Sequence, residues 1–410
     1  MTASTPSPGS PVEFIAAPSS LGLRPNEAGL EPETWRGPEV LLATGLAARV
    51  GASVSRLAHP AYAFAPQSGT RIRNGVSIRG YSLDLAAHVA DARARHAFPV
   101  VLGGDCSVLL GCLLGNRRAG GRGLVHVDGH SDFFHPGNYD TSKRLGSVAG
   151  MDLALATGRG EPLLTRWPGL DGALVDDSDA CQVGERDAGT AEFDAAYGDI
   201  ARTGITRITI QQLLARGPAA VASALVDWLA ARALEQAWLH VDLDVLDQSQ
   251  LPAVDSPGSP GLDFDGLDAL LGPLVASGRI AGVDFTIYDP GRDPGLAHAG
   301  RIARTIERCA GPRAQRKREP IGRLRPFAAH ELRDPVTLNH SRENAMNEDR
   351  IKGQWKQLAG KVKAQWGKLT DDDLAVADGD SEYLVGRIQE RYGIARDEAR
   401  KQLQDFSRTL

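Results

Sequence analysis

Three short segments place acidic, imidazole and thiol side chains directly after apolar runs. They read Gly-Gly-Asp-Cys-Ser over 103–107, Asp-Gly-His-Ser-Asp over 128–132 and Asp-Leu-Asp over 242–244. In the second segment Asp128, His130 and Asp132 are spaced two residues apart, and on an extended backbone such side chains point to the same side. Asp242 and Asp244 repeat that spacing in the third segment. The pattern predicts one cluster of ligands built from two strands.

Carboxylates buried at the end of an apolar sheet need a compensating positive charge, and a divalent cation is the usual one. Carboxylates with an imidazole suit Mn²⁺, and less selectively Zn²⁺ or Fe²⁺. We therefore expect metal binding by Asp128, His130, Asp132, Asp242 and Asp244. These ligands are more than one ion needs, so we expect two ions that share carboxylates. Such a pair lowers the pKa of a bridging water and polarises a C=N or C=O group, which predicts hydrolysis.

Other polar residues near these segments have two interpretations each. His126 and His240 lie two positions before a ligand aspartate, so they either support the ligands or pack as strand histidines. His135 and Asp289 are predicted to contact substrate, with a solvated loop and a capping role as the alternatives. Tyr139 has the same loop alternative, and Asp284 the same capping or surface alternative. Arg186 is a candidate to bind a substrate carboxylate.

The elements that must position these residues alternate along the chain. Short apolar or β-branched runs are followed by segments with helical periodicity, which predicts a mainly parallel sheet flanked by helices. The expected strands are 12–16, 98–102, 123–127, 180–184, 205–210, 237–241 and 280–287, and the clearest helices are 83–95, 107–116, 219–235 and 266–276. In such sheets ligands bind outside the carboxyl ends of the strands, where all three motifs fall.

Composition separates this part of the chain from the rest. The 410 residues carry a net charge of −5, which divides into −9 over 1–309, +4 over 310–345 and 0 over 346–410. We expect an α/β domain over 1–309, a basic linker over 310–345 and a small helical domain over 346–410. The charge is too small to predict a nucleic-acid or membrane partner. No targeting segment is visible, and the four cysteines lack disulfide or zinc spacing, so we expect a cytoplasmic protein with reduced thiols.

Together the three motifs resemble the ureohydrolase family of arginase, agmatinase and formimidoylglutamase, over about residues 12–309. The resemblance implies a three-layer α/β/α fold, two Mn²⁺ ions, hydrolysis of a guanidino or related linear C–N bond in a small nitrogenous substrate, and often a homo-oligomer. Asp128 and Asp242 would bridge the ions. His130 and Asp244 would complete one ion and Asp132 would serve the other, so that Asp132 and Asp242 act in catalysis.

Departures from the family pattern are equally informative. The family usually has histidine where this chain has Cys106, a softer candidate ligand that would weaken or retune one ion site. The Gly-Gly-Asp-Cys-Ser motif is similar to that of an arginase-like subgroup. A family histidine aligns with Ala149, and the glutamate that commonly holds a guanidinium aligns near Ile287. Both losses argue against arginine or agmatine as the substrate.

The C-terminal segment, from Met346 to about residue 406, resembles the CsbD-like family of small stress-response proteins. That resemblance implies a small helical fold without catalytic chemistry. Apolar residues recur at helical spacing in its first half, namely Ile351, Trp355, Leu358, Val362 and Trp366. Because the segment begins with its own methionine, we interpret the chain as a fusion of two units.

Two functions follow from these patterns. The first is a metal-dependent hydrolase in which metal-activated hydroxide attacks a linear guanidino, amidino or amide C–N bond. The alternative is a catalytically idle metal-binding or scaffold protein whose CsbD-like segment carries the cellular role.

Overall fold

The computed structural model describes residues 10–187 and 193–310, and, nearer the C-terminus, 362–363, 365–370, 388, 391–392 and 402. The chain divides into two units, Met1–Arg333 and Asp334–Leu410. The expected linker over 310–345 falls outside the described residues except for Ala310, so the sequence-based domain boundaries stay a prediction.

The first unit is built on one eight-stranded sheet with the strand order β2-β1-β3-β8-β7-β4-β5-β6. Every neighbouring pair is parallel. Most strands are buried on both faces, as expected of a parallel sheet covered by helices. The strands are β1 (Val12–Ala17), β2 (Ser53–Arg56), β3 (Phe98–Gly103), β4 (Leu124–Val127), β5 (Ala180–Val183), β6 (Thr206–Ile208), β7 (Ala237–Asp242) and β8 (Ile280–Thr286).

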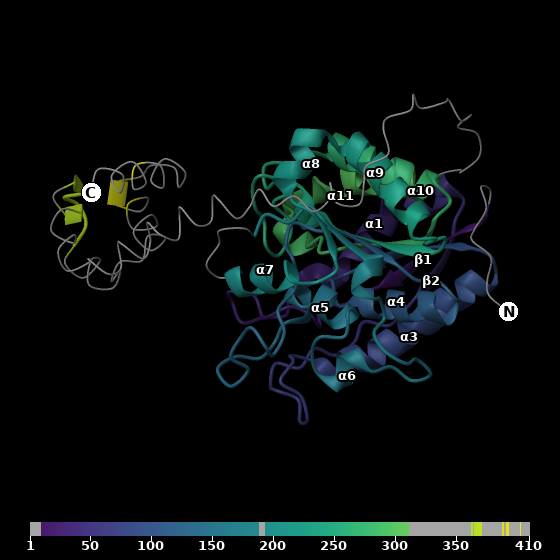
Figure 1. Cartoon of the computed structure of the whole chain (residues 1–410), viewed down its shortest axis with the longest axis horizontal. Coiled ribbons are helices and arrows are strands. Elements are labelled where there is room, and N and C mark those ends of the chain that lie inside the picture. The colour runs from purple at the N-terminus through teal and green to yellow at the C-terminus, as the bar shows by residue number, and fades with distance from the viewer. Residues whose placement is uncertain are drawn as a thin grey trace. The chain divides into compact units, whose positions relative to one another are not determined.

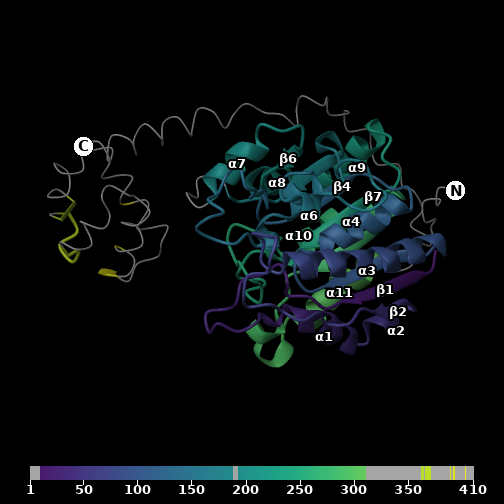
Figure 2. The same ribbon diagram turned by 90° about the horizontal axis from the view of Figure 1, so that it is seen from below.

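Helices cover both faces of the sheet, which confirms the three-layer α/β/α fold (Figure 1 and Figure 2). One face packs against α3 (Gly75–Ala94), α4 (Val108–Arg118), α5 (Asp152–Ala156), α6 (Pro162–Thr165) and α7 (Asp194–Ile200). The other packs against α1 (Gly37–Ala43), α2 (Leu46–Val50), α8 (Ile210–Arg216), α9 (Pro218–Ala231), α10 (Phe264–Ala276) and α11 (Ala299–Ala310). Short 3₁₀ helices lie at 33–36, 148–150, 177–179, 243–245, 290–292 and 294–296.

Some element bounds differ from the sequence-based expectation. The strand expected over 205–210 ends at Ile208, because the Thr209 hydroxyl accepts a hydrogen bond from the Gln212 amide at 3.3 Å and begins α8. Helix α3 begins at Gly75, eight residues before the expected start. The edge strand β2 was not expected, because its sequence Ser-Val-Ser-Arg is short and polar.

No single described helix is long and apolar enough to span a membrane, although the bent pair α8 and α9 passes the same test when taken together. All four cysteines are free and buried. In the C-terminal unit, Val362 and Trp366 of the predicted apolar stripe are buried, together with Leu369 and Ile388. The rest of that stripe lies outside the described residues.

Candidate metal centre

The motif residues meet at the carboxyl ends of β3, β4, β7 and β8, which are neighbours in the central half of the sheet. A cavity of about 170 Å³ opens there. Its lining includes the predicted ligands Cys106, His130, Asp132, Asp242 and Asp244. The sequence-based inference that three distant motifs form one cluster is therefore supported by the geometry.

One donor group combines residues that follow β4 and β7. Atoms of Asp128, His130 and Asp244 that are able to bind a metal lie within 4.8 Å of one another. His130 Nδ1 lies 2.9 Å from Asp244 Oδ2 and 3.7 Å from Asp128 Oδ1. Backbone amides orient both carboxylates, since the His130 amide donates to Asp128 Oδ1 at 2.6 Å and the Gly129 amide donates to Asp244 Oδ1 at 3.1 Å.

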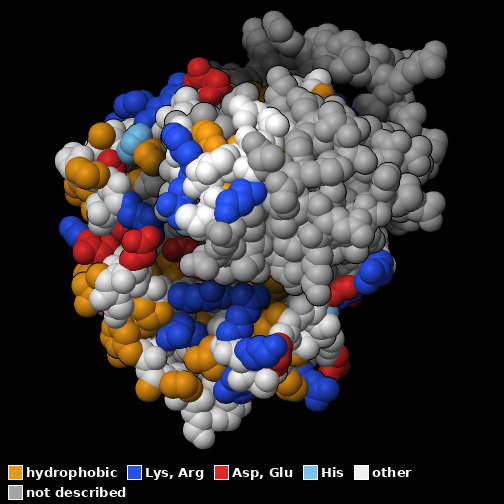
Figure 3. All heavy atoms as spheres, turned by 90° about the vertical axis from the view of Figure 1, so that its left-hand side faces the viewer, with side chains coloured by type: hydrophobic (Ala, Val, Ile, Leu, Met, Phe, Trp, Pro, Cys, Tyr) orange, Lys and Arg blue, Asp and Glu red, His pale blue; other side chains and the backbone are white. Residues whose placement is uncertain are grey.

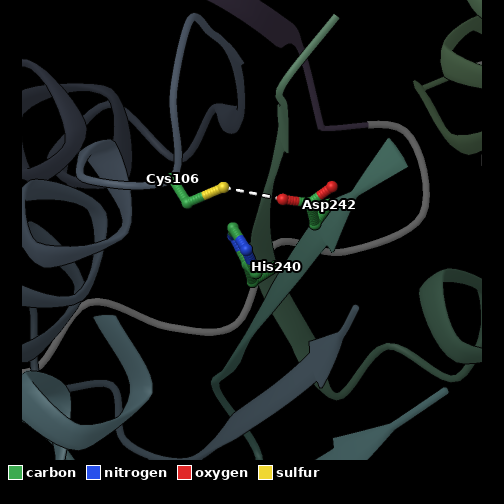
Figure 4. A group of neighbouring side chains, drawn as sticks. All are labelled: Cys106, His240 and Asp242. Atoms are coloured by element: carbon green, nitrogen blue, oxygen red, sulfur yellow. Dashed lines mark hydrogen bonds between the residues drawn. The ribbon is translucent and has the colours of Figure 1, made fainter. Parts of the chain in front are cut away.

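A second donor group joins β7 to the turn after β3. Atoms of Cys106, His240 and Asp242 lie within 4.8 Å of one another (Figure 4). The Cys106 thiol donates to Asp242 Oδ2 at 2.7 Å, and the Asp244 amide donates to Asp242 Oδ1 at 2.7 Å. Cys106 also shares a donor group with Asp132 and Asp152, so the thiol lies between several carboxylates.

The turn that carries Cys106 is fixed by its neighbours. The Asp105 carboxylate accepts hydrogen bonds from the Ser19 hydroxyl at 2.7 Å and from the Gly22 amide at 3.1 Å. At Gly104 an added Cβ would lie only 1.9 Å from the Ser19 carbonyl oxygen, so the close approach of the two backbones requires glycine. Gly104 therefore helps to set the position of Cys106.

A layer of buried side chains lies directly beneath the predicted ligands. The imidazoles of His126 and His240 stack with ring centroids 4.6 Å apart. His126 Nε2 is 3.2 Å from Asp152 Oδ1, and His240 Nδ1 is 2.5 Å from Asp284 Oδ2. Asp152 belongs to none of the three sequence motifs, and only its position at the start of α5 brings it here. The sequence left the role of the two histidines open; the structure places both in a polar layer.

Burial and mutual repulsion make the negatively charged form of these carboxylates unfavourable unless a cation compensates it. Burial, reinforced by the charges of nearby carboxylates, raises the pKa of Asp132 and of Asp242 well above the usual value. Burial and the charge of Asp244 raise the pKa of Asp128 to about 6. Among the described residues, Asp128 Oδ2 is buried and has no hydrogen-bond partner. A buried oxygen without a hydrogen bond, 3.9 Å from His126 Nε2 and among four aspartates, is a costly arrangement that a divalent ion would relieve, so the residues fit a metal centre.

The two predicted substrate-contact residues, His135 and Asp289, lie away from the cavity lining. Within the described part of the chain, neither His135 nor Asp289 is among the residues that line the cavity. His135 Nε2 lies 3.2 Å from Asp199 Oδ2, and Asp289 accepts from the Gly291 amide at 2.8 Å as the cap of a 3₁₀ helix. Their contact with substrate stays a prediction. Arg186 donates to the Asp244 carbonyl at 2.7 Å, so it contacts the backbone of a candidate ligand.

The remaining cavity wall includes Tyr139, Ala149 and Ile287, which the sequence analysis named. It also includes Arg24 and Arg144, which sequence patterns did not single out. The Arg144 guanidinium lies over the Phe134 and Tyr139 rings, 5.3 Å from each centroid. Arg and Lys side chains also gather in a band on the face of the molecule shown in Figure 3. No motif marks Arg24 or Arg144, because only the folded loops bring them to the cavity.

The fold and site define a class, namely three-layer α/β/α proteins with a carboxylate-rich centre at the carboxyl edge of a parallel sheet. The arginase family profile matches residues 63–310, and the chain belongs to that family. The sequence-based family assignment is thus confirmed. A CsbD-like profile matches residues 349–401, which confirms the second resemblance.

Solved structures agree on the fold. Arginase from Bacillus subtilis superposes with a TM-score of 0.61 at 22% identity, covering 75% of this chain and 100% of that chain. Proclavaminate amidino hydrolase from Streptomyces clavuligerus gives 0.54 at 18% identity, over 77% and 96% of the two chains. A Trypanosoma cruzi formiminoglutamase with Mn²⁺ gives 0.52 at 15% identity, over 75% and 95%.

Relatives of the C-terminal segment are small whole proteins. A UPF0337 protein of Pseudomonas aeruginosa is 60% identical over 65 residues, which are 16% of this chain and 100% of that protein. The UPF0337 protein YjbJ of Escherichia coli is 56% identical over 61 residues, 15% of this chain and 88% of that protein.

Proposed function

We propose that the protein is a metal-dependent hydrolase that cleaves a linear, non-peptide C–N bond of a guanidino, amidino or amide substrate. The observation that carries the proposal is the convergence of Asp132, Asp242 and Asp244 on one cavity, beside Asp128, which shares a donor group with Asp244. Asp128 Oδ2 is buried and has no hydrogen-bond partner among the described residues. Membership of the arginase family supports the same reaction class.

In this proposal the site binds two divalent ions such as Mn²⁺, one near the Asp128, His130 and Asp244 group and one near Cys106 and Asp242. Asp128 and Asp242 would be shared by the two ions, His130 and Asp244 would complete one ion, and Asp132 with Cys106 would serve the other. Each of these residues belongs to a group of donor atoms that lie within 4.8 Å of one another. When bound, the ions supply Lewis-acid polarisation of the substrate and activation of a water nucleophile. Asp132 and Asp242 line the cavity, which supports a role for their carboxylates as proton acceptors during the proposed reaction.

The cavity wall favours particular substrates. Ile287 is apolar, so nothing at that position pairs with a guanidinium, and Ala149 provides no imidazole. Arg24 and Arg144 place positive charge on the wall and suit a carboxylate or another anionic group. We therefore propose a small nitrogenous substrate that carries an anionic group and differs from arginine and agmatine. We also propose that the protein is cytoplasmic and forms a homo-oligomer.

Metal analysis with a substrate panel tests the function. The full chain, purified from manganese-supplemented cells, is expected to contain about two ions per chain and to hydrolyse a member of a panel of guanidino, formimidoyl and amide compounds. Asp242→Asn should lose both metal and turnover. The matched control is Asp265→Asn, at an aspartate that is 83% exposed on α10, and it should lose neither. A folded wild-type protein without stoichiometric metal would support the scaffold alternative instead.

A further inference from the structure

His240 has the hydrogen-bonding pattern of a metal ligand. Its Nδ1 lies 2.5 Å from Asp284 Oδ2, and because a carboxylate only accepts, Nδ1 carries the proton. The Trp238 indole donates to the other oxygen of Asp284 at 2.5 Å and holds that carboxylate in place. The lone pair of His240 therefore lies on Nε2. Ligating histidines commonly have this arrangement, with the second ring nitrogen donating to a carboxylate.

The Nε2 atom faces the site without a partner. His240 is wholly buried, and among the described residues Nε2 makes no hydrogen bond. A carboxylate oxygen, Asp152 Oδ2, lies 3.8 Å away and is likewise buried without a hydrogen-bond partner among the described residues. Two ligand atoms that each lie about 2.1 Å from one ion are at most about 4.2 Å apart, so this separation fits a shared ion and is too long for a hydrogen bond.

The stacked neighbour His126 has the opposite pattern. Its Nδ1 lies 3.0 Å from the Gln182 amide oxygen and its Nε2 lies 3.2 Å from Asp152 Oδ1, so both ring nitrogens face acceptors. An imidazole that donates from both nitrogens is cationic and offers no lone pair. Of the two stacked histidines, His240 is therefore the one able to bind a metal. His126 instead pairs with Asp152, through the carboxylate oxygen Oδ1 that does not face His240.

Cys106 and Asp242 complete the donor set. The thiol of Cys106 now donates to Asp242 Oδ2 at 2.7 Å, and a cation at this position would replace that proton and bind both atoms. Figure 4 shows Cys106, His240 and Asp242 converging from β7 and the turn after β3. Sulfur, imidazole and carboxylate together form a set that suits Zn²⁺ better than Mn²⁺, which prefers oxygen ligands.

We propose that His240 supplies the imidazole that position 106 lacks, so that Cys106, His240 and Asp242 form a zinc-selective site beside the Asp128, His130 and Asp244 group. The centre then holds two chemically different ion positions. This inference rests on the proposed function, because both concern one metal centre. It adds a ligand from the middle of β7 and a metal preference that the motif residues alone do not specify.

Competitive metal loading of the full-length protein tests the inference. After equilibration with equal concentrations of Zn²⁺ and Mn²⁺, wild type should retain about one zinc per chain at the thiolate position. Loaded with Co²⁺, it should show a sulfur-to-cobalt charge-transfer absorption in the near ultraviolet. Cys106→Ser should abolish that absorption, and His240→Gln should weaken zinc binding at this position by about 100-fold or more while the other ion remains.

Two further variants keep the test decisive. His126→Gln is the matched control, since it changes the stacked neighbour of equal burial, and it should retain the cobalt absorption. Asp284→Asn preserves side-chain size but is able to donate to Nδ1, which moves the ring proton to Nε2. It should weaken zinc binding about 10- to 100-fold even if His240→Gln fails to fold.

The outcomes separate the two proposals. Unchanged zinc binding in folded His240→Gln and Asp284→Asn overturns the assignment of His240. Wild type that binds only manganese, with no cobalt–sulfur absorption, overturns the zinc site and leaves the proposed hydrolase standing. Wild type that binds no ion in any of these experiments overturns both.

Discussion

The sulfur of Cys106 lies 2.7 Å from Asp242 Oδ2, although the two residues are 136 positions apart in the chain. Burial, together with the charge of Asp242, raises the pKa of the thiol well above its usual value, so in the absence of a cation the proton stays on sulfur. This contact places residue 106 inside the carboxylate cluster. In the proposed metal centre, cysteine in place of the usual family histidine would therefore change the metal preference directly.

Replacing Cys106 with histidine should shift the centre toward manganese. An imidazole is a better partner than a thiolate for Mn²⁺, so Cys106→His should raise manganese occupancy toward about two ions per chain. Metal content after dialysis against Mn²⁺ measures the effect. Cys106→Ala removes the sulfur without adding a ligand and serves as the control. Equal occupancy in wild type and Cys106→His would show that residue 106 does not ligate.

Gly104 should be intolerant of any side chain. Its Cβ would lie 1.9 Å from the Ser19 carbonyl oxygen, which is backbone and unable to move aside. Gly104→Ala should therefore destabilise the fold by about 1–3 kcal/mol or more and weaken metal binding, because Asp105 and Cys106 follow directly. Thermal unfolding and metal titration measure the two effects.

Gly80 provides the control for that substitution. It lies inside α3, and nothing comes within 4 Å of its added Cβ. Gly80→Ala should stabilise the protein by about 0.5–1 kcal/mol, since alanine is the better helix former. Equal destabilisation by both variants would contradict the steric explanation for Gly104.

The central strands and the predicted ligands could be found from the sequence for a physical reason. Strands β3, β4, β7 and β8 are apolar runs because both of their faces are buried, and polar residues at their ends stand out against that background. Since parallel strands end at one edge, the three motifs had to lie near one another. Family resemblance then indicated the roles of individual residues.

Other parts of the site could not be predicted from the sequence, because their positions depend on packing between distant elements. Asp152 follows no strand and has no metal-ligand spacing, yet α5 brings it between His126 and His240. The pairing of His240 with Asp284 depends on the register of β7 against β8, which sequence periodicity does not specify. The arginines of the cavity wall come from loops, where neither periodicity nor a motif gives a position.

Glu185 should make stability depend on pH. Burial raises the pKa of Glu185 from its ordinary value of 4.5 to about 7, even though the neighbouring Arg207 guanidinium opposes this rise. The folded state therefore binds the proton more tightly than the unfolded state, and the free energy of unfolding should fall as the pH rises from about 4.5 to about 7 through this group. The effect is at most about 3 kcal/mol, at 1.36 kcal/mol per pKa unit.

Glu185→Gln tests this dependence in metal-free protein. The variant lacks the titration, so its stability relative to wild type should be higher at pH 8 than at pH 5, as measured by denaturant unfolding. Glu39→Gln changes a glutamate that is 56% exposed and should leave the pH profile unaltered. A constant difference between wild type and Glu185→Gln across this range would contradict the prediction.

The C-terminal segment should fold without the arginase-family domain. It matches the Pseudomonas aeruginosa protein over 100% of that protein's length, and its described residues include the buried side chains Val362, Trp366 and Leu369. Residues 346–410 alone should therefore give a helical circular dichroism spectrum with a cooperative thermal transition. Trp366→Ala should remove about 3–5 kcal/mol of stability and unfold so small a domain, whereas Gln365→Ala, at an exposed position, should not. A fragment without helical signal, or one insensitive to Trp366→Ala, would contradict the interpretation of the chain as two fused units.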